Sequence, residues 1–109
     1  MPKIATVSLF TDRTTTGNSD SHQPWNNNMS FHAYGSTTAG AGAATINIYV
    51  SNDNVDFSTL AGIIPLTLST SVSGDGFVSL GSWRYVRANV SAISGTGAKV
   101  SVIMGVEIP

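Results

Sequence analysis

The chain has 109 residues, which suits one domain of common size with a modest hydrophobic core. Only 10% of the residues are charged, the formal net charge is −1, and there is no cysteine. This composition argues against electrostatic binding of nucleic acid, a basic membrane-surface helix, disulfides and thiol catalysis, so we expect no nucleic-acid and no membrane partner. A surface of hydroxyls and amides in place of ions is easily desolvated by another protein, which favours a multi-subunit setting.

Apolar and polar residues begin to alternate near the N-terminus, with the period of two that marks a half-buried strand. Residues 3–10 are therefore predicted to form the first strand. The following residues 11–28, TDRTTTGNSDSHQPWNNN, contain only one large apolar side chain, that of Trp25. We expect this segment to be a polar loop, or an arm that becomes ordered on a partner. Trp25 is then either the anchor of that arm or a cap on its own sandwich, and the sequence leaves both interpretations open.

Three further strands are predicted at residues 29–34, 45–51 and 63–69. Each has one apolar face, as a two-sheet sandwich requires. Their inward residues are Met29, Phe31, Ala33, Ile46, Ile48, Val50, Ile64, Leu66 and Leu68. Pro65 cannot donate a ladder hydrogen bond, so its strand is expected at the edge of a sheet or with the proline nitrogen facing solvent. The small residues 35–43 indicate a hairpin loop or a bulged corner.

A polar turn is predicted at residues 52–54, because Asn and Asp hydrogen-bond their own backbone and tolerate left-handed conformations. Phe57 and Leu60 are expected to pack back from this turn onto the sandwich. Asp53 and Asp56 supply oxygens of the kind that calcium prefers, but the glycine and distal glutamate of an EF-hand loop are missing. Ordinary turn chemistry is the favoured interpretation.

The C-terminal third has the clearest pattern. A tight turn is predicted at residues 74–76, a short strand at 77–80, and two long strands at 83–90 and 99–108. Glycines in the stretch 94–97 favour a hairpin turn between the long strands. Their inward residues are Val86, Ala88, Val90, Val100, Val102, Met104, Val106 and Ile108. The sequence thus predicts an all-β chain: a single small β-sandwich or jelly-roll-like domain over residues 1–109, with about seven to eight antiparallel strands.

Groups that could carry catalysis or hold a metal are few. His22, His32 and Asp20 could meet at a metal, but nothing in their spacing demands it. Ser19, Asp20 and His22 have the residue types of a hydrolytic triad, yet they are neighbours on one loop without a rigid frame. The lone Glu107 has no second carboxylate to form a glycosidase pair. We therefore expect no enzymatic activity and no cofactor.

Trp83, Tyr85 and Arg87 stand out as candidate partner-binding residues. They project from one side of one predicted strand and belong to the residue types most enriched at binding hot spots. Outward aromatic rings also bind sugars by stacking. The alternative is that the two rings cover the rim of a sheet while Arg87 pairs with Glu107 across the predicted hairpin. With Trp25, these residues are the proposed partner-binding set.

Two stretches resemble elements of small β-sandwich virion proteins of tailed bacteriophages. They are INIYVSNDNVDFSTL, residues 46–60, and GSWRYVRANVSAISGTGAKVSVIMGVEI, residues 81–108. The resemblance implies a capsid decoration or cement protein: a homotrimer that is made in the host cytoplasm, lies on the capsid surface and binds the major capsid protein or other virion proteins. A tail, neck or baseplate protein is the alternative. The order of the two stretches is also similar to that in galactose-binding-like jelly rolls, which implies a carbohydrate-binding module displayed on the virion as a further alternative.

Overall fold

The computed structural model describes residues 3–24, 28–80 and 83–108. The described residues form strands and no helix, which confirms the all-β prediction. None of them builds a helix long and apolar enough to cross a membrane. The strands are β1 (Lys3–Arg13), β2 (Gly17–Asn18), β3 (Asn28–Ser36), β4 (Ala39–Ser51), β5 (Thr59–Leu68), β6 (Ser73–Leu80), β7 (Tyr85–Thr96) and β8 (Lys99–Ile108).

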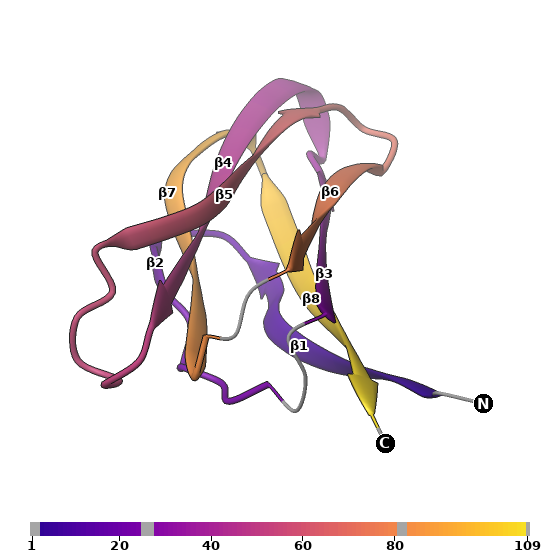
Figure 1. Ribbon diagram of the computed structural model, residues 1–109. Coiled ribbons are helices and arrows are strands. Elements are labelled where there is room, and N and C mark those ends of the chain that lie inside the picture. Colours follow the sequence, from indigo (N-terminus) through magenta and orange to yellow (C-terminus); the bar gives the residue numbers. More distant parts are fainter. Residues whose placement is uncertain (1–2, 25–27, 81–82, 109) are drawn as a thin grey trace.

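The strands form two four-stranded antiparallel sheets that pack face to face (Figure 1). Sheet A has the order β1-β8-β3-β6 and sheet B the order β2-β7-β4-β5. Strand β1 pairs with β8, β2 with β7, β3 with β6 and β4 with β5, as in one long hairpin that has been rolled up. The pairs β3–β8 and β4–β7 close the roll. This connectivity is that of the eight-stranded jelly roll.

The core lies between the sheets and follows the predicted alternation. Phe31 is 1% exposed and Ile48 is fully buried, and each faces the opposite sheet. Burying a side chain of this size contributes roughly 1.5–3 kcal/mol. The predicted inward residues of β3, β4, β5, β7 and β8 are all buried wherever their side chains are described. The edge position of the strand that contains Pro65 is also confirmed, because β5 ends sheet B.

The predicted hairpin between the two last strands is wrong. Strand β7 belongs to sheet B and β8 to sheet A, so the short connection between them crosses from one sheet to the other. Gly95 and Gly97 do take positive φ angles, 117° and 62°, but at a crossover corner. The main-chain N–H of Thr38, in the β3–β4 corner, donates to the carbonyl of Thr96 at 3.0 Å and holds the two corners together. Arg87 on β7 therefore has no cross-strand neighbour on β8, and its predicted pairing with Glu107 is wrong.

The predicted tight turn at residues 74–76 is also wrong, because glycines occur inside a strand there. Residues 74–76 are not a turn but part of β6, and a Cβ on Gly76 would collide with the carbonyl oxygen of Phe31 on the neighbouring β3. The chain turns earlier, where Ser69 Oγ accepts from the N–H of Ser71 at 3.3 Å. In residues 35–43 the bulged-corner interpretation is confirmed, since the β4–β7 register shifts between Ala39 and Ala43.

The polar segment that follows the first predicted strand runs along its own sandwich as far as it is described. Strand β1 extends to Arg13, and β2 pairs with β7. The N–H of Ser19 donates to the carbonyl of Ala88 at 2.8 Å, and His22 exchanges main-chain hydrogen bonds of 2.9 Å with Val86. The pairing of this segment with β7 was not predicted, because short polar strands have no apolar alternation. Trp25 lies outside the described residues.

Candidate functional site

The proposed partner-binding residues are placed at one end of sheet B. Tyr85 and Arg87 lie in β7 opposite Ser51 and Tyr49 of β4. Trp83 precedes β7 and packs, partly buried, against the core. Trp83 therefore covers the rim of the sandwich, which was the alternative interpretation for this ring, while Tyr85 and Arg87 point away from the core.

Arg87 is held by an aromatic ring. Its guanidinium carbon lies 4.3 Å from the ring centroid of Phe57, which comes from the loop between β4 and β5. Phe57 is 8% exposed but stands apart from the main core cluster. Its burial confirms that it packs back from the turn, whereas Leu60 is 44% exposed and the same prediction for Leu60 is wrong. Arg87 Nε is buried without a hydrogen-bond partner among the described residues, so stacking is what positions the guanidinium.

The loop that carries Phe57 is organised by Asp53. Its Oδ1 accepts hydrogen bonds from the N–H groups of Asp56 and Val55, each at 2.9 Å, and from Ser51 Oγ at 2.8 Å. The hydrogen bonds from Asp56, Val55 and Ser51 lower the pKa of Asp53 from 3.8 to about 2, because they stabilise the carboxylate form. One carboxylate oxygen is thus used in ordinary turn chemistry, as the sequence suggested.

An open hollow of about 280 Å³ lies beside this loop. Described residues from β4, the β4–β5 loop, β5 and the start of the β7 segment line it: Val50, Ser51, Asn52, Asp53, Asp56, Thr59 and Trp83. The side-chain oxygen of Asn52 accepts from the N–H of Arg84 at 3.1 Å, which ties the loop to the Trp83 segment. An indole, carboxylates and hydroxyls therefore meet in one hollow.

The outer face of sheet B combines amides that contact one another with an exposed apolar side chain, Ile63. Asn89 Nδ2 donates to Asn18 Oδ1 at 2.7 Å, and Asn47 Nδ2 donates to Asn89 Oδ1 at 3.4 Å. These three amides form a ladder across β2, β7 and β4 that the sequence reading did not find, because strand pairing cannot be read from alternation. Each such hydrogen bond contributes of the order of 1 kcal/mol.

The histidines and the triad-like serine are not brought together. His22 lies beside β7 in sheet B, whereas His32 lies on β3 in sheet A. Ser19 is buried, where its Oγ donates to the carbonyl of Asp20 and accepts from the N–H of Ala88, each at 2.9 Å. These hydrogen bonds attach the segment around Ser19 to β7, so its hydroxyl has a structural role. Within residues 3–24, 28–80 and 83–108, no three His, Asp or Glu side chains gather at a possible metal site.

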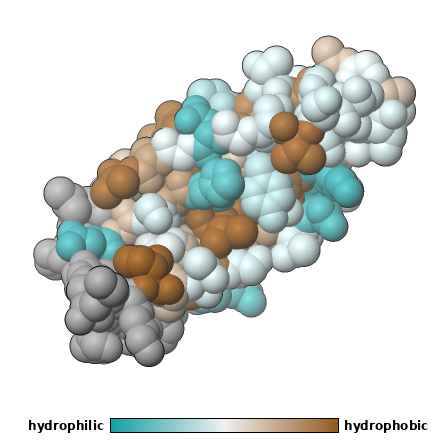
Figure 2. All heavy atoms as spheres, turned by 90° about the vertical axis from the view of Figure 1, so that its right-hand side faces the viewer, coloured by the Kyte–Doolittle hydropathy of each residue, from teal (hydrophilic) through white to brown (hydrophobic). Residues whose placement is uncertain are grey.

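A second surface, which the sequence reading missed, is the outer face of sheet A. Its outward positions are Ile4, Thr6, Ser8, Ser30, His32, Tyr34, Gly74, Gly76, Val78, Ile103 and Gly105, and we call this surface the open face. Ile4 is 67% and Val78 71% exposed. Figure 2 shows this side of the molecule, where apolar side chains reach the surface between weakly polar ones. The available signal was the set of glycines at outward strand positions, which present no side chain on this face.

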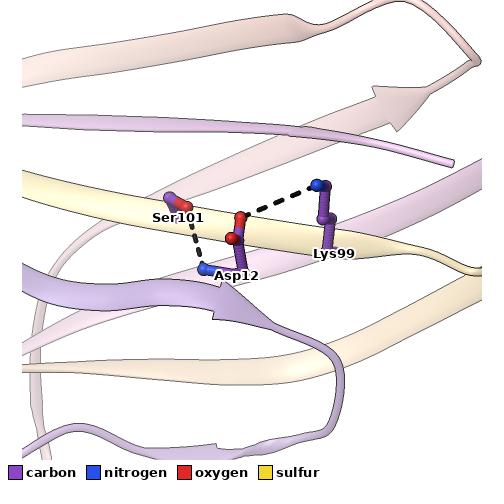
Figure 3. A network of polar contacts seen from close by, with 3 residues as sticks. All are labelled: Asp12, Lys99 and Ser101. Carbon is purple, nitrogen blue, oxygen red and sulfur yellow. Dashed lines mark hydrogen bonds and ion pairs between the residues drawn. The ribbon is translucent and has the colours of Figure 1, made fainter.

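One end of the open face is closed by the last residues of β1. Asp12 has a φ of 48°, and its main-chain N–H donates to Ser101 Oγ on β8 at 3.0 Å. Its carboxylate lies 4.0 Å from Lys99 Nζ (Figure 3). A hollow of about 160 Å³ lies here, and its described lining residues are Asp12, Tyr34, Gly35, Ser36, Val72, Lys99 and Ser101. The open face therefore has a hollow at this end and an exposed apolar side chain, Ile4, at the other.

The fold recurs in prophage-encoded proteins. The structure of the SPBc2 prophage-derived protein YomS aligns with 99% of this chain and 96% of its own, at a TM-score of 0.60 and 13% sequence identity. The PBSX exported protein XepA aligns with 97% of this chain at a TM-score of 0.54 and 12% identity, and the matched part is 36% of XepA. No family model and no curated protein sequence matches the chain. The class defined here is thus a small jelly roll whose fold is shared with phage-derived proteins.

Proposed function

We propose that this chain is a non-enzymatic structural protein of a phage virion that decorates the capsid by binding between coat subunits. The fold similarity to YomS over nearly the whole of both chains supports a phage setting. The low charge supports burial against other subunits, because few ions must be desolvated. The observation that carries the proposal is Arg87 at the end of sheet B. Its guanidinium is held against an aromatic ring, and its Nε has no hydrogen-bond partner among the described residues.

Arg87 has the properties of an interface anchor. The Phe57 ring fixes the guanidinium plane before any partner arrives, so little side-chain entropy is lost on binding. Nε of this guanidinium is buried without a hydrogen-bond partner among the described residues, so we propose that the terminal N–H groups donate to a carboxylate or carbonyl of the partner. We propose Tyr85 and Trp83 as its neighbours in the capsid contact. The partner in this proposal is the major capsid protein.

The test is co-sedimentation with empty shells assembled from the major capsid protein of the phage genome that encodes this chain. The wild-type chain is expected to pellet with the shells to a saturating ratio. Arg87→Ala is expected to weaken binding about 30-fold, since a hot-spot residue contributes about 2 kcal/mol. Arg13→Ala is the matched control, because Arg13 also lies over a ring, that of Phe10 at 5.2 Å, but its donors are used by the carbonyls of Thr15 and Thr16.

The outcomes separate the virion locations. A chain that stays in the supernatant with shells but pellets with tail tubes or baseplates is a tail protein, and the capsid proposal fails. A chain that binds neither is not a virion structural protein.

A carbohydrate-binding module is the second candidate, and the hollow beside Trp83 favours it. An indole with nearby carboxylates, an amide and hydroxyls offers a stacking surface and hydrogen-bond partners for a sugar. A glycan array probed with the wild type and with Trp83→Ala tests this candidate. Binding that disappears in Trp83→Ala supports it, and a blank array with the wild type rejects it.

A further inference from the structure

The four edge strands of the sandwich are poor sites for strand addition. Strand β1 has irregular pairing near Phe10 and a positive φ at Asp12, and β2 is only two residues long. Strand β5 contains Pro65, and β6 has Asp75 between two glycines. Bulges, prolines, charges and short strands are the devices that prevent edge-to-edge pairing. Association of this protein is therefore expected to use a sheet face and not an edge.

The two faces differ in their suitability. On the outer face of sheet B, the amides of the ladder already contact one another, and the Arg87 end is the surface proposed above for the capsid contact. On the open face, Ile4 and Val78 stand exposed beside outward glycines. The charged side chains described there, Asp12 and Lys99, pair with each other at 4.0 Å. Two copies of this face can therefore meet without like-charge repulsion between these groups.

The open face is also self-complementary along the strands. On β8, Ile4 is level with Glu107, the hollow is level with Lys99 and Ser101, and Ile103 lies midway between them. A twofold axis that crosses the strands at Ile103 exchanges the two ends. Ile4 of each copy then lies over the Asp12 end of β1 in the other copy, at the rim of its hollow.

The residues on that axis form one cross-strand row. Ser8 and His32 both pair with Ile103, and His32 pairs with Gly76. Neighbouring strands lie about 4.8 Å apart, and each of about nine residues adds about 3.3 Å along its strand. Four strands therefore give a face of roughly 30 by 19 Å. With the relief of the side chains, its accessible area approaches the roughly 800 Å² per partner of a standard interface.

We propose that the open face binds the open face of a second copy of this chain, about a twofold axis along the row of Ile103 and His32. A single face that binds itself gives a closed pair. The trimer that the phage resemblance implies would need two different patches instead. This proposal concerns the chain alone, so it is tested without capsids and can fail independently of the proposed function.

The first experiment is sedimentation equilibrium of the full chain from about 1 to 300 µM, a range suited to an interface of this size. The wild type is expected to form dimers. Val78→Lys places two unpaired ammonium groups in the contact and is expected to weaken the dimer about 100-fold. Ile63→Lys is the matched control: Ile63 is 52% exposed, but it lies on the outer side of sheet B opposite Asn47, and the dimer should persist.

The second experiment uses the absence of cysteine from the chain. Ile103→Cys places one thiol near the axis, facing its own copy, and a short bismaleimide that spans the roughly 10 Å between facing sheets is expected to cross-link the dimer rapidly. Ile63→Cys is the control and is expected to cross-link only slowly, through random collisions.

Any of the following results would overturn the proposal. The wild type remains a monomer at every concentration, or a trimer forms. Ile63→Lys disrupts the assembly as much as Val78→Lys does, which would show a contact between two different patches. Ile103→Cys cross-links no faster than Ile63→Cys. The chain stays monomeric and Val78→Lys abolishes only binding to shells, which would assign the open face to the coat protein.

Discussion

The two outer faces of this sandwich have the same architecture but differ in how their polar side chains are paired. On sheet B, side chains of neighbouring strands bind one another, as in the ladder of Asn18, Asn89 and Asn47. On sheet A, Val78 and Ile4 project into solvent beside outward glycines. Amides that are already paired gain little from a partner, whereas exposed apolar side chains gain from being covered. This difference is why we propose the open face for self-association.

The largest expected effect tests whether the shared core, and not the outer faces, holds the sandwich together. Phe31→Ala removes a ring that is 1% exposed between the sheets and is expected to cost about 3–5 kcal/mol of unfolding free energy. Phe57→Ala removes a ring from the outer side of sheet B and is expected to cost about half as much, while releasing Arg87. Urea denaturation of both variants measures this, and equal losses would show that the outer cluster is part of the core.

The next effect compares polar residues on the two faces. Asn89→Ala breaks the amide ladder and is expected to lower the unfolding free energy by about 1 kcal/mol. His32→Ala, on the open face, is expected to change it by less than about 0.5 kcal/mol when measured at about 1 µM, where the proposed dimer is expected to be dissociated. A loss at His32 as large as that at Asn89 would show that the open face has its own stabilising network.

The smallest effect is a pH dependence confined to the sheet B side. The native pKa of Asp53 is about 2, below the ordinary 3.8, so its carboxylate contributes stability above about pH 4 that is lost as the pH falls towards 2. Asp53→Asn is expected to remove this part of the acid sensitivity. Urea midpoints at about pH 5 and pH 2.5 measure it, and an unchanged difference between the two pH values in the variant would contradict the role of the Asp53 turn.

Alternation in the sequence was sufficient to predict the inner residues, because inward positions are apolar in either sheet. Pro65 correctly marked an edge, since it lacks the N–H that a central strand must donate. Alternation does not say which sheet a strand joins, and this is why β7 and β8 were paired wrongly. Glycine is also required for two different reasons. Gly95 supplies a positive φ at a corner, whereas Gly76 lies inside β6 and lets the neighbouring β3 approach closely.

The candidate site was less predictable than the fold. Arg87 was selected for its residue type, but its contact with Phe57 depends on the path of a loop that no periodicity encodes. The open face was missed because it is defined by the pairing of four strands and by outward glycines, and a single strand shows neither.

The two histidines provide the most direct measurement of whether the open face is covered, because one lies on each side of the molecule. His32 is exposed on the axis row of the open face, whereas His22 lies beside β7 on the sheet B side. The rate of carbethoxylation of each imidazole by diethyl pyrocarbonate, read by peptide mass spectrometry, should be compared at about 1 and about 300 µM protein, below and above the expected association. Protection of His32 alone at the higher concentration is the expected result. Equal rates at His32 across the range, or equal protection of both histidines, would contradict self-association through the open face.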